Sequence, residues 1–589
     1  MTTYDLAPEV KIHQFDGAWA GYKDIATELR TAIQKKKQDQ TIVAIECYPG
    51  TRNEEIAAEL LPLLPVEKVV FADDWALNNE EVTATIQSHL TDDRVFGIMS
   101  HYEVSDFYPA EKLAEIQAEI AATKGLVVVY GTGATVIAPT PDILIYADLA
   151  RWEIQCRYRG ENKPNWKADN AGEDALRKFK RGYFFEWRMA DRQKKKLYQQ
   201  VDFLLDTNKK NEPKMVRGED YRNGLNQVSK APFRVVPYFD ASVWGGQWMK
   251  NNFGLDPAAD NYGWAFDGVP EENSLYMRFG DIRIEVPSTN VVNHFPNELL
   301  GPKVHSRFGT EFPIRFDYLD TVGGGNLSLQ VHPLVEYAQD KFGIHYTQDE
   351  SYYILEADND STVYLGTKEG TTKEAIMTDL EKAAEGNYRF PDEKYINVFP
   401  VKKHDHILIP AGTIHCGGPS TVVLEISATP YIFTFKLWDW ERTGLDGMPR
   451  PVHLEHGREN LQLDRDTKWV KDNLINQFET LHEDNDSKVE RTGLHELEFI
   501  ETHRHWFKET VTVHTNDSVN MLNLVEGESA VVESIDDSFA PFEVHYGETF
   551  IVPAIVGTYQ IRNTSDNEEV AVIQAFVRNL YKRNAYQYF

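Results

Sequence analysis

The chain has 589 residues and a mass of 67.5 kDa, enough for roughly four domains at about 150 residues each. Its 61 basic and 92 acidic residues leave a net charge of −31, which disfavours binding to nucleic acid or to an anionic membrane surface. Cys47, Cys156 and Cys416 are too few and too far apart for a disulfide framework, and this composition is typical of a reducing cytosol. The N-terminal sequence shows no signal peptide, and no apolar run approaches the ~18 residues of a membrane helix, so we expect a cytoplasmic protein.

Residues 1–205 alternate short apolar runs with helical patterns, which predicts an α/β domain built on a parallel sheet. We expect buried strands at five apolar runs, namely 42–45, 69–72, 95–98, 126–130 and 143–146. Between some of these runs, residues 54–64 and 111–122 repeat apolar side chains at spacings of three and four, as amphipathic helices do.

A basic segment and a polar segment follow. Residues 177–196 (RKFKRGYFFEWRMADRQKKK) fit either a helix with a solvated charged face or a phosphate-binding patch. Residues 206–230 are polar and contain glycine and proline, which predicts a linker. We therefore place the end of the first domain at residue 205.

From residue 231 onward the sequence has the pattern of an all-β protein. Short alternating or β-branched runs recur between turn residues, as in antiparallel sandwiches and jelly rolls. A helical insertion is expected at 371–385, with a threonine before acidic residues as its cap. HDHILIPAGTIH at 404–415 resembles YGETFIVPAIVGTYQ at 546–560, so we expect two similar β domains, at 231–495 and at 496–589. Only the first has a histidine after its Pro-Ala turn, and we expect metal there alone.

The segment LSLQVHP contains the first candidate site residues. Alternate side chains of a strand share a face, so Gln330 and His332 point the same way, with Ser328 beside them. Pro333 ends this strand because it has no N–H to donate. An amide oxygen and an imidazole nitrogen are thus presented together.

Two later residues complete a candidate metal site. Glu350 follows His332 by 18 residues, which is enough chain for a loop and a returning strand. His415 follows the tight turn that begins at Pro410 and opens the next strand. Histidine nitrogens with a carboxylate suit zinc, and they also admit manganese, iron or nickel. We expect one divalent metal, zinc being favoured, with coordination positions left for a substrate.

The motifs LSLQVHPLVEYA, QDESYYIL and LIPAGTIHCGG resemble those of the type I phosphomannose isomerases (mannose-6-phosphate isomerases) of the cupin superfamily. The likeness extends over about residues 230–589 and is nearest to the bacterial short form. It implies a cupin (jelly-roll) fold with one zinc ion bound by Gln330, His332, Glu350 and His415. It also implies a phosphorylated hexose as the substrate, with mannose 6-phosphate and fructose 6-phosphate interconverted through an enediol.

Two positions depart from the family pattern, which has a lysine where this chain has Gln348 and an arginine where it has Lys436. Lys436 keeps the positive charge but lacks the guanidinium fork that makes two bonds to a phosphate. We expect Lys436 and Arg442 to serve catalysis, and Ser328 and Lys436 to contact the substrate. Two alternatives stay open: a non-catalytic metal-binding cupin that senses a phosphosugar, and an isomerase for another sugar phosphate.

The first domain distantly resembles a P-loop fold of the nucleoside or uridine kinase type. Residues 41–57 (TIVAIECYPGTRNEEIA) lie at a predicted strand-to-helix turn, where a phosphate loop would lie. The motif GxxxxGK[ST] is absent, because no Lys-Ser/Thr pair follows Gly50. We therefore expect a degenerate domain with a regulatory or structural role. Asp73, Asp74 and the basic segment 177–196 leave the binding of a nucleotide or phosphosugar open.

Overall fold

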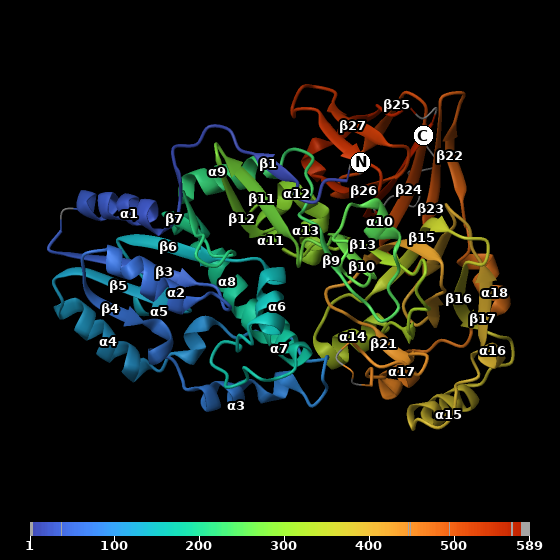
Figure 1. Ribbon diagram of the computed structural model, residues 1–589, viewed down its shortest axis with the longest axis horizontal. Coiled ribbons are helices and arrows are strands. Elements are labelled where there is room, and N and C mark those ends of the chain that lie inside the picture. Colours follow the sequence, from blue (N-terminus) through green and yellow to red (C-terminus); the bar gives the residue numbers. More distant parts are fainter. Residues whose placement is uncertain are drawn as a thin grey trace. The chain divides into compact units, whose positions relative to one another are not determined.

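The chain forms two compact units, seen in the computed structural model of residues 4–36, 38–445, 447, 449–493, 495–566 and 569–578. The α/β unit comprises residues 9–228 and 271–295, and the β unit comprises residues 1–8, 229–270 and 296–589 (Figure 1). Each unit is assembled from separate stretches of sequence, whereas we had expected the domains to follow one another along the chain.

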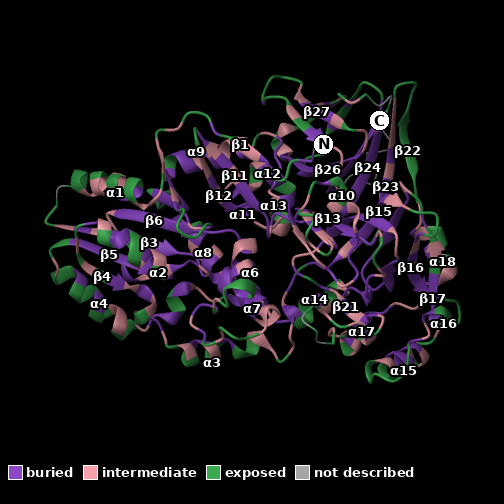
Figure 2. Ribbon diagram, viewed as in Figure 1, coloured by how far each residue is buried: buried purple, intermediate pink, exposed green. Residues whose placement is uncertain are grey.

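A seven-stranded sheet in the order β2-β8-β7-β6-β3-β5-β4 forms the centre of the α/β unit. Strands β3 to β7 pair in parallel, and β8 and β2 are antiparallel additions at one edge. The strands are β2 (Ala18–Ala20), β3 (Gln40–Cys47), β4 (Val66–Phe71), β5 (Gly125–Gly131), β6 (Ile143–Asp148), β7 (Phe203–Asp206) and β8 (Lys214–Arg217). The central strands are buried (Figure 2), which explains their nearly continuous apolar sequences. Four of the five predicted strands are confirmed.

Helices alternate with these strands along the chain. They include α1 (Tyr22–Lys36), α3 (Asn79–Leu90), α4 (Ala110–Ala122), α6 (Arg151–Gly160), α7 (Ala175–Arg181), α8 (Trp187–Leu197) and α9 (Gly218–Val228). Helix α4 confirms the prediction for 111–122. The predicted helix at 54–64 consists of successive short turns: α2 (Asn53–Glu55), a π-helical turn (Ile56–Leu60) and a 3-10 turn (Leu61–Leu63).

The strand predicted at 95–98 is wrong. These residues form a loop in which the N–H groups of Val95 and Phe96 both donate to Asp93 Oδ1. Both side chains are buried although no sheet contains them. An apolar run indicates that residues are buried but says nothing of their hydrogen bonds. A buried loop and a buried strand therefore cannot be told apart from the run alone.

The linker predicted at 206–230 is also wrong, since these residues contain β8 and α9. Met215 and Val216 of β8 and Leu225 of α9 are completely buried. The polar side chains that dominate this segment lie between its buried positions. The segment therefore completes the sheet of the α/β unit.

Residues 271–295 add a small sheet to the α/β unit. Strands β11 (Ser274–Phe279) and β12 (Ile282–Pro287) form a hairpin, and β1 (Glu9–Lys11) pairs in parallel with β11. Helix α11 (Thr289–His294) follows. This excursion from the middle of the sequence explains why a single domain boundary near residue 230 does not describe the fold.

The β unit begins with two antiparallel sheets that carry the candidate site. Their orders are β18-β15-β20-β13-β10-β9 and β17-β16-β19-β14-β21. The six-stranded sheet contains β9 (Tyr238–Asp240), β10 (Trp264–Gly268), β13 (Arg315–Asp320), β15 (Asp349–Ala357), β18 (His406–Ile409) and β20 (Thr421–Ala428). The five-stranded sheet contains β14 (Leu329–Val331), β16 (Thr362–Thr367), β17 (Ile396–Pro400), β19 (His415–Gly417) and β21 (Phe435–Trp438).

A second pair of antiparallel sheets follows, in the orders β22-β23-β24-β31-β26-β29 and β25-β30-β27-β28. The larger contains β22 (Glu479–Glu483), β23 (Ser487–Gly493), β24 (Ile500–Phe507), β26 (Asn520–Glu526), β29 (Thr549–Val552) and β31 (Val570–Val577). The smaller contains β25 (Thr510–His514), β27 (Ser529–Ser534), β28 (Phe542–His545) and β30 (Thr558–Asn563). Leu522 and Val572 of the larger sheet share one apolar core with Val532 and Ile561 of the smaller. Since β22 and β23 precede residue 496, this module starts earlier than expected.

The two similar sequence segments have matching places in the two pairs of sheets. In the first pair the chain leaves β18, passes the Pro-Ala turn and enters β19 of the smaller sheet. In the second pair it leaves β29, passes the corresponding turn and enters β30. In both pairs the chain thus passes from the larger to the smaller sheet at this turn, within a multidomain chain of sheets and helices.

The helices of the β unit are mostly short. They include α10 (Trp248–Asn252), α12 (Pro296–Leu300), α13 (Pro302–Phe308), α14 (Val335–Phe342), α15 (Lys373–Ala384), α16 (Asp392–Tyr395), α17 (Leu454–Asn460) and α18 (Thr467–Asn473). Helix α15 confirms the predicted insertion, and Thr372 caps it by accepting a hydrogen bond from the N–H of Ala375. Among the helices described, none combines the length and apolarity needed to cross a membrane.

Candidate metal centre

Three side chains from three strand segments meet inside the β unit. His332 directly follows β14, Glu350 lies in β15, and His415 opens β19. Their ligand atoms lie within 4.8 Å of one another, and all three residues are buried. Glu350 Oε1 is 2.7 Å from His415 Nε2, and Glu350 Oε2 is 3.1 Å from His332 Nε2. The structure thus brings together residues that lie up to 83 positions apart in the sequence.

Backbone contacts set which nitrogen of each histidine carries the proton. His332 Nδ1 lies 2.8 Å from the carbonyl oxygen of Phe433, and His415 Nδ1 lies 2.8 Å from that of Thr413. A carbonyl can only accept, so Nδ1 is the protonated nitrogen in both rings. In the neutral rings each Nε2 therefore turns a lone pair toward the Glu350 carboxylate.

The atoms that face one another in the cluster, the two Nε2 atoms and the carboxylate oxygens, are all hydrogen-bond acceptors. A cation between them would satisfy all of them. Among the described residues, His332 Nε2 and Glu350 Oε1 have no partner with hydrogen-bond geometry. Burial lowers the pKa of His332, but the Glu350 charge, the close polar contact with Glu350 and the contact with Phe433 together raise the pKa overall. A divalent ion satisfies the same three groups without protonating them, and two imidazoles with a carboxylate suit zinc. The residues present therefore fit a metal ion.

Gln330 adjoins this cluster, as predicted. On β14 it lies opposite His415 of β19 and opposite Lys436 of β21. Gln330 Nε2 is 3.2 Å from His415 Nε2, and Ser328 Oγ donates to Gln330 Oε1 at 3.3 Å. A half-turn of the amide would present Oε1 to the cluster. Ligation by Gln330 stays a prediction.

The two predicted catalytic residues have different surroundings. Directly opposite residues of antiparallel strands share a face, so Lys436 lies on the same side of its sheet as Gln330. Arg442 instead pairs with Asp439, with Nη2 2.5 Å from Oδ1. That contact favours the interpretation of Arg442 as one half of an ion pair. The catalytic roles of both residues stay predictions.

Glu425 is a candidate functional residue that the sequence analysis missed. It lies in β20, where it is opposite Tyr352 of β15 and Asp317 of β13. Burial raises the pKa of Glu425 well above its ordinary value, and the charges of Asp317 and Glu350 raise it further. A lone carboxyl group within the apolar run TVVLEIS was the available signal, because a buried charge needs a specific reason.

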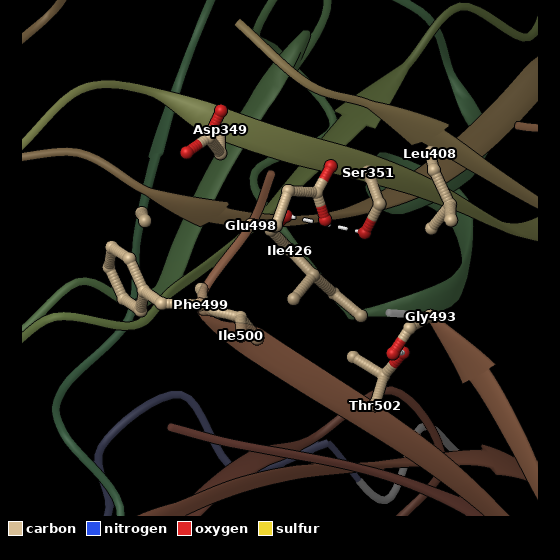
Figure 3. A pocket seen from close by; sticks show the side chains of 10 residues that line it. Asp349, Ser351, Leu408, Ile426, Gly493, Glu498, Phe499, Ile500 and Thr502 are labelled. Atoms are coloured by element: carbon tan, nitrogen blue, oxygen red, sulfur yellow. Dashed lines mark hydrogen bonds between the residues drawn. The ribbon is translucent and has the colours of Figure 1, made fainter. Parts of the chain in front are cut away.

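A small cavity lies between β15 and the segment 498–502 (Figure 3). Its volume of about 10 Å³ is at the lower limit for one water molecule. Ser351 and Glu498 project into it, and Ser351 Oγ donates to the carbonyl oxygen of Ile426 at 3.4 Å. This space is far too small for a hexose phosphate, so it is no substrate pocket.

The basic segment 177–196 of the α/β unit is mixed in exposure: Lys195 and Lys196 are exposed, and Arg177 lines an open cavity of about 890 Å³. Lys194 is buried and donates to both oxygens of Asp148, at 2.8 and 2.9 Å. Arg181 is buried and pairs with Glu186 at 3.3 Å. The positive charges of Lys194 and Arg181 are thus neutralised by carboxylates of the same unit. Binding of a nucleotide or phosphosugar there stays a prediction without support from these contacts.

Comparisons with known proteins give one match within the first part of the chain and others to isomerases. A family model described as "Domain of unknown function (DUF8485)" matches residues 21–230, and the kinase-like interpretation of this region is not confirmed. Mannose-6-phosphate isomerase ManA of Bacillus subtilis (strain 168) is 22% identical over 346 residues, which cover 58% of this chain and 98% of that protein. The chain therefore has distant homologues among the mannose-6-phosphate isomerases.

Solved structures of similarly named proteins also match. The crystal structure of the mannose 6-phosphate isomerase from Bacillus subtilis has a TM-score of 0.49 at 18% identity, covering 59% of this chain and 99% of that one. A zinc-bound mannose 6-phosphate isomerase has a TM-score of 0.45 at 13% identity, covering 59% of this chain and all of that one.

Proposed function

We propose that the chain is a divalent-metal-dependent sugar-phosphate isomerase that interconverts mannose 6-phosphate and fructose 6-phosphate through an enediol. The observation that carries this proposal is the buried cluster of His332, Glu350 and His415, whose facing atoms are all acceptors. The distant homologues among mannose-6-phosphate isomerases supply the reaction and the substrate.

In this proposal His332, Glu350 and His415 hold one divalent ion, most simply zinc, with Gln330 as a fourth ligand. When bound, the ion supplies a positive charge that stabilises an enediolate oxygen. Lys436 contacts the substrate phosphate from the face it shares with Gln330, with Ser328 beside it.

A proton must leave one carbon of the sugar and return at its neighbour. We assign this role to Glu425, a buried carboxyl next to Glu350 that can hold and pass on a proton, and whose pKa is raised by burial and by the charges of Asp317 and Glu350. The predicted candidates Lys436 and Arg442 are the alternatives. Arg442 is the weaker of the two because Asp439 already engages it.

One observation favours a second candidate function, a non-catalytic metal-binding protein that senses a phosphosugar. Gln348 stands where the resembled family has a lysine, and its neutral amide can neither carry a proton nor neutralise a phosphate. The same fact leaves an isomerase for another sugar phosphate as a variant of the first proposal.

A coupled assay separates these candidates. Purified protein is given mannose 6-phosphate, and fructose 6-phosphate is followed with and without prior removal of metal by a chelator. Turnover that disappears with the chelator and returns with Zn²⁺ or Mn²⁺ supports the isomerase. Tight metal binding without turnover on any hexose 6-phosphate would instead support the sensor. The variant Glu425→Gln, which lacks the proposed proton carrier, measures the background activity of the preparation.

A further inference from the structure

Gln348 makes two buried hydrogen bonds that link the candidate metal centre to its surroundings. It immediately precedes β15, two residues before Glu350, and side chains at this spacing on an extended chain share a face. Gln348 Nε2 donates to Glu350 Oε2 at 3.0 Å, and Gln348 Oε1 accepts from the backbone N–H of Phe433 at 3.2 Å. Only about 6% of the residue is exposed, so water does not replace these bonds cheaply.

The residue whose N–H Gln348 binds also holds one of the histidines. The carbonyl oxygen of Phe433 accepts from His332 Nδ1 at 2.8 Å. A single amide side chain therefore connects the Glu350 carboxylate with the residue that fixes the tautomer and ring orientation of His332. These contacts join the two groups through one short path of hydrogen bonds, although Gln348 and Phe433 are 85 residues apart.

The two bonds require an amide at this position. One end must donate to a carboxylate while the other accepts from a backbone N–H, and the glutamine amide does both without a charge. A lysine could donate to Glu350 but could not accept from Phe433. A glutamate could accept from Phe433 but would oppose the Glu350 carboxylate with a second negative charge.

We propose that Gln348 is a positioning residue that sets the metal affinity of the centre. It holds the Glu350 carboxylate and, through Phe433, the ring of His332 in a fixed orientation relative to each other. This inference rests on the metal centre of the proposed function, but it does not require the isomerase reaction. Partners that orient metal ligands in this way typically contribute 10- to 100-fold to metal affinity.

The test measures metal binding and not activity. Dissociation constants for Zn²⁺ are determined by competition with a chromogenic chelator for the full chain, and the visible spectrum of the Co²⁺ form reports the ligand geometry. Gln348→Met keeps the size but removes both bonds, and Gln339→Met alters an exposed glutamine of α14 as the matched control. We expect Gln348→Met to weaken Zn²⁺ binding by roughly 10- to 100-fold and to change the Co²⁺ spectrum. We expect no change for the control.

A change of less than about threefold in Gln348→Met would overturn the proposal. If that variant does not fold, Gln348→Glu decides, because it keeps the acceptor for Phe433 and loses only the donor to Glu350. Simple attraction between charges predicts that the added carboxylate tightens Zn²⁺ binding, whereas the loss of positioning predicts weaker binding. Weaker binding supports the proposal, and equal or tighter binding overturns it. A wild-type protein that binds Zn²⁺ tightly but shows no turnover would remove the isomerase reaction and leave this inference standing.

Discussion

Gln330 and Lys436 occupy directly opposite positions on the neighbouring strands β14 and β21. Their side chains consequently lie on the same face of the sheet, the face on which Gln330 approaches His415. This register places one cation beside the candidate metal centre, where the substrate phosphate of the proposed reaction needs a partner. It also makes Lys436 the residue whose replacement best tests the substrate assignment.

Lys436→Ala should lower kcat/KM for mannose 6-phosphate by roughly 10- to 100-fold, because a hydrogen bond to a charged group contributes about 1.5–3 kcal/mol. Lys436→Arg should be tolerated or improve turnover, since guanidinium binds phosphate through two bonds. The metal content of both variants, measured by elemental analysis, should equal that of the wild type. The exposed Lys341 provides the control variant Lys341→Ala. If Lys436→Ala showed wild-type kinetics on every hexose 6-phosphate, another cation would have to bind the substrate phosphate.

His332→Ala should remove most of the bound metal. The remaining Glu350 and His415 would leave a centre with too few protein ligands, and the lost imidazole cannot be replaced from the backbone. Elemental analysis of the purified protein checks this, with His345→Ala as the control at an exposed histidine. Full metal content in His332→Ala would show that the ion binds elsewhere.

Glu425→Gln should lower kcat by about 10²- to 10⁴-fold while leaving the metal in place, as expected for the loss of a proton carrier. The amide keeps the size of the buried side chain and removes only its ability to exchange a proton. The pH dependence of kcat should lose one ionisation in the variant. Glu369, which is exposed, provides the control Glu369→Gln. An unchanged pH profile would assign proton transfer to Lys436 or to another group.

Glu350 could be predicted from the sequence and Glu425 could not, and the reason shows how far the sequence alone describes this site. Glu350 was found because it lies in a short motif whose distance from His332 permits a returning strand. Glu425 became visible only when β20 was seen to pair with both β15 and β13, which places its carboxyl among Tyr352, Glu350 and Asp317. Register between strands far apart in the sequence is set by the packing of the whole module, and no local pattern encodes it.

The same limit explains the errors in the fold. The apolar run at 95–98 was taken for a strand because its burial is visible in the sequence, but its hydrogen-bond partners are not. Segment 206–230 has the composition of a linker because most of its residues are polar, although Met215 and Leu225 among others are buried. Gln348 differs from the residue of the resembled family in the sequence alone, but its bond to Phe433 depends on a contact 85 residues away.

A buried histidine next to the metal-bearing strand should make the β unit sensitive to acid. Burial, together with the nearby charge of Arg504, lowers the pKa of His406 to about 3. The neutral ring lies between two hydroxyl groups: Nε2 is 2.9 Å from Ser351 Oγ, and Nδ1 is 3.0 Å from Thr492 Oγ1. In the unfolded chain the same ring has a pKa near 6.5.

Because the pKa of His406 is depressed in the folded state, its contribution to stability is complete above about pH 6.5 and is lost as the pH falls toward 3. Within that window this one group should reduce the free energy of unfolding by about 1.4 kcal/mol for each pH unit. His406→Gln, which can still bond to hydroxyl groups but does not titrate, should therefore lose about 1.4 kcal/mol less than the wild type between pH 6 and pH 5. Urea unfolding at both pH values measures this difference, and the exposed His482 provides the control His482→Gln. Equal losses in His406→Gln and the wild type would mean that His406 takes up its proton in the folded state and that acid acts on the β unit through other groups.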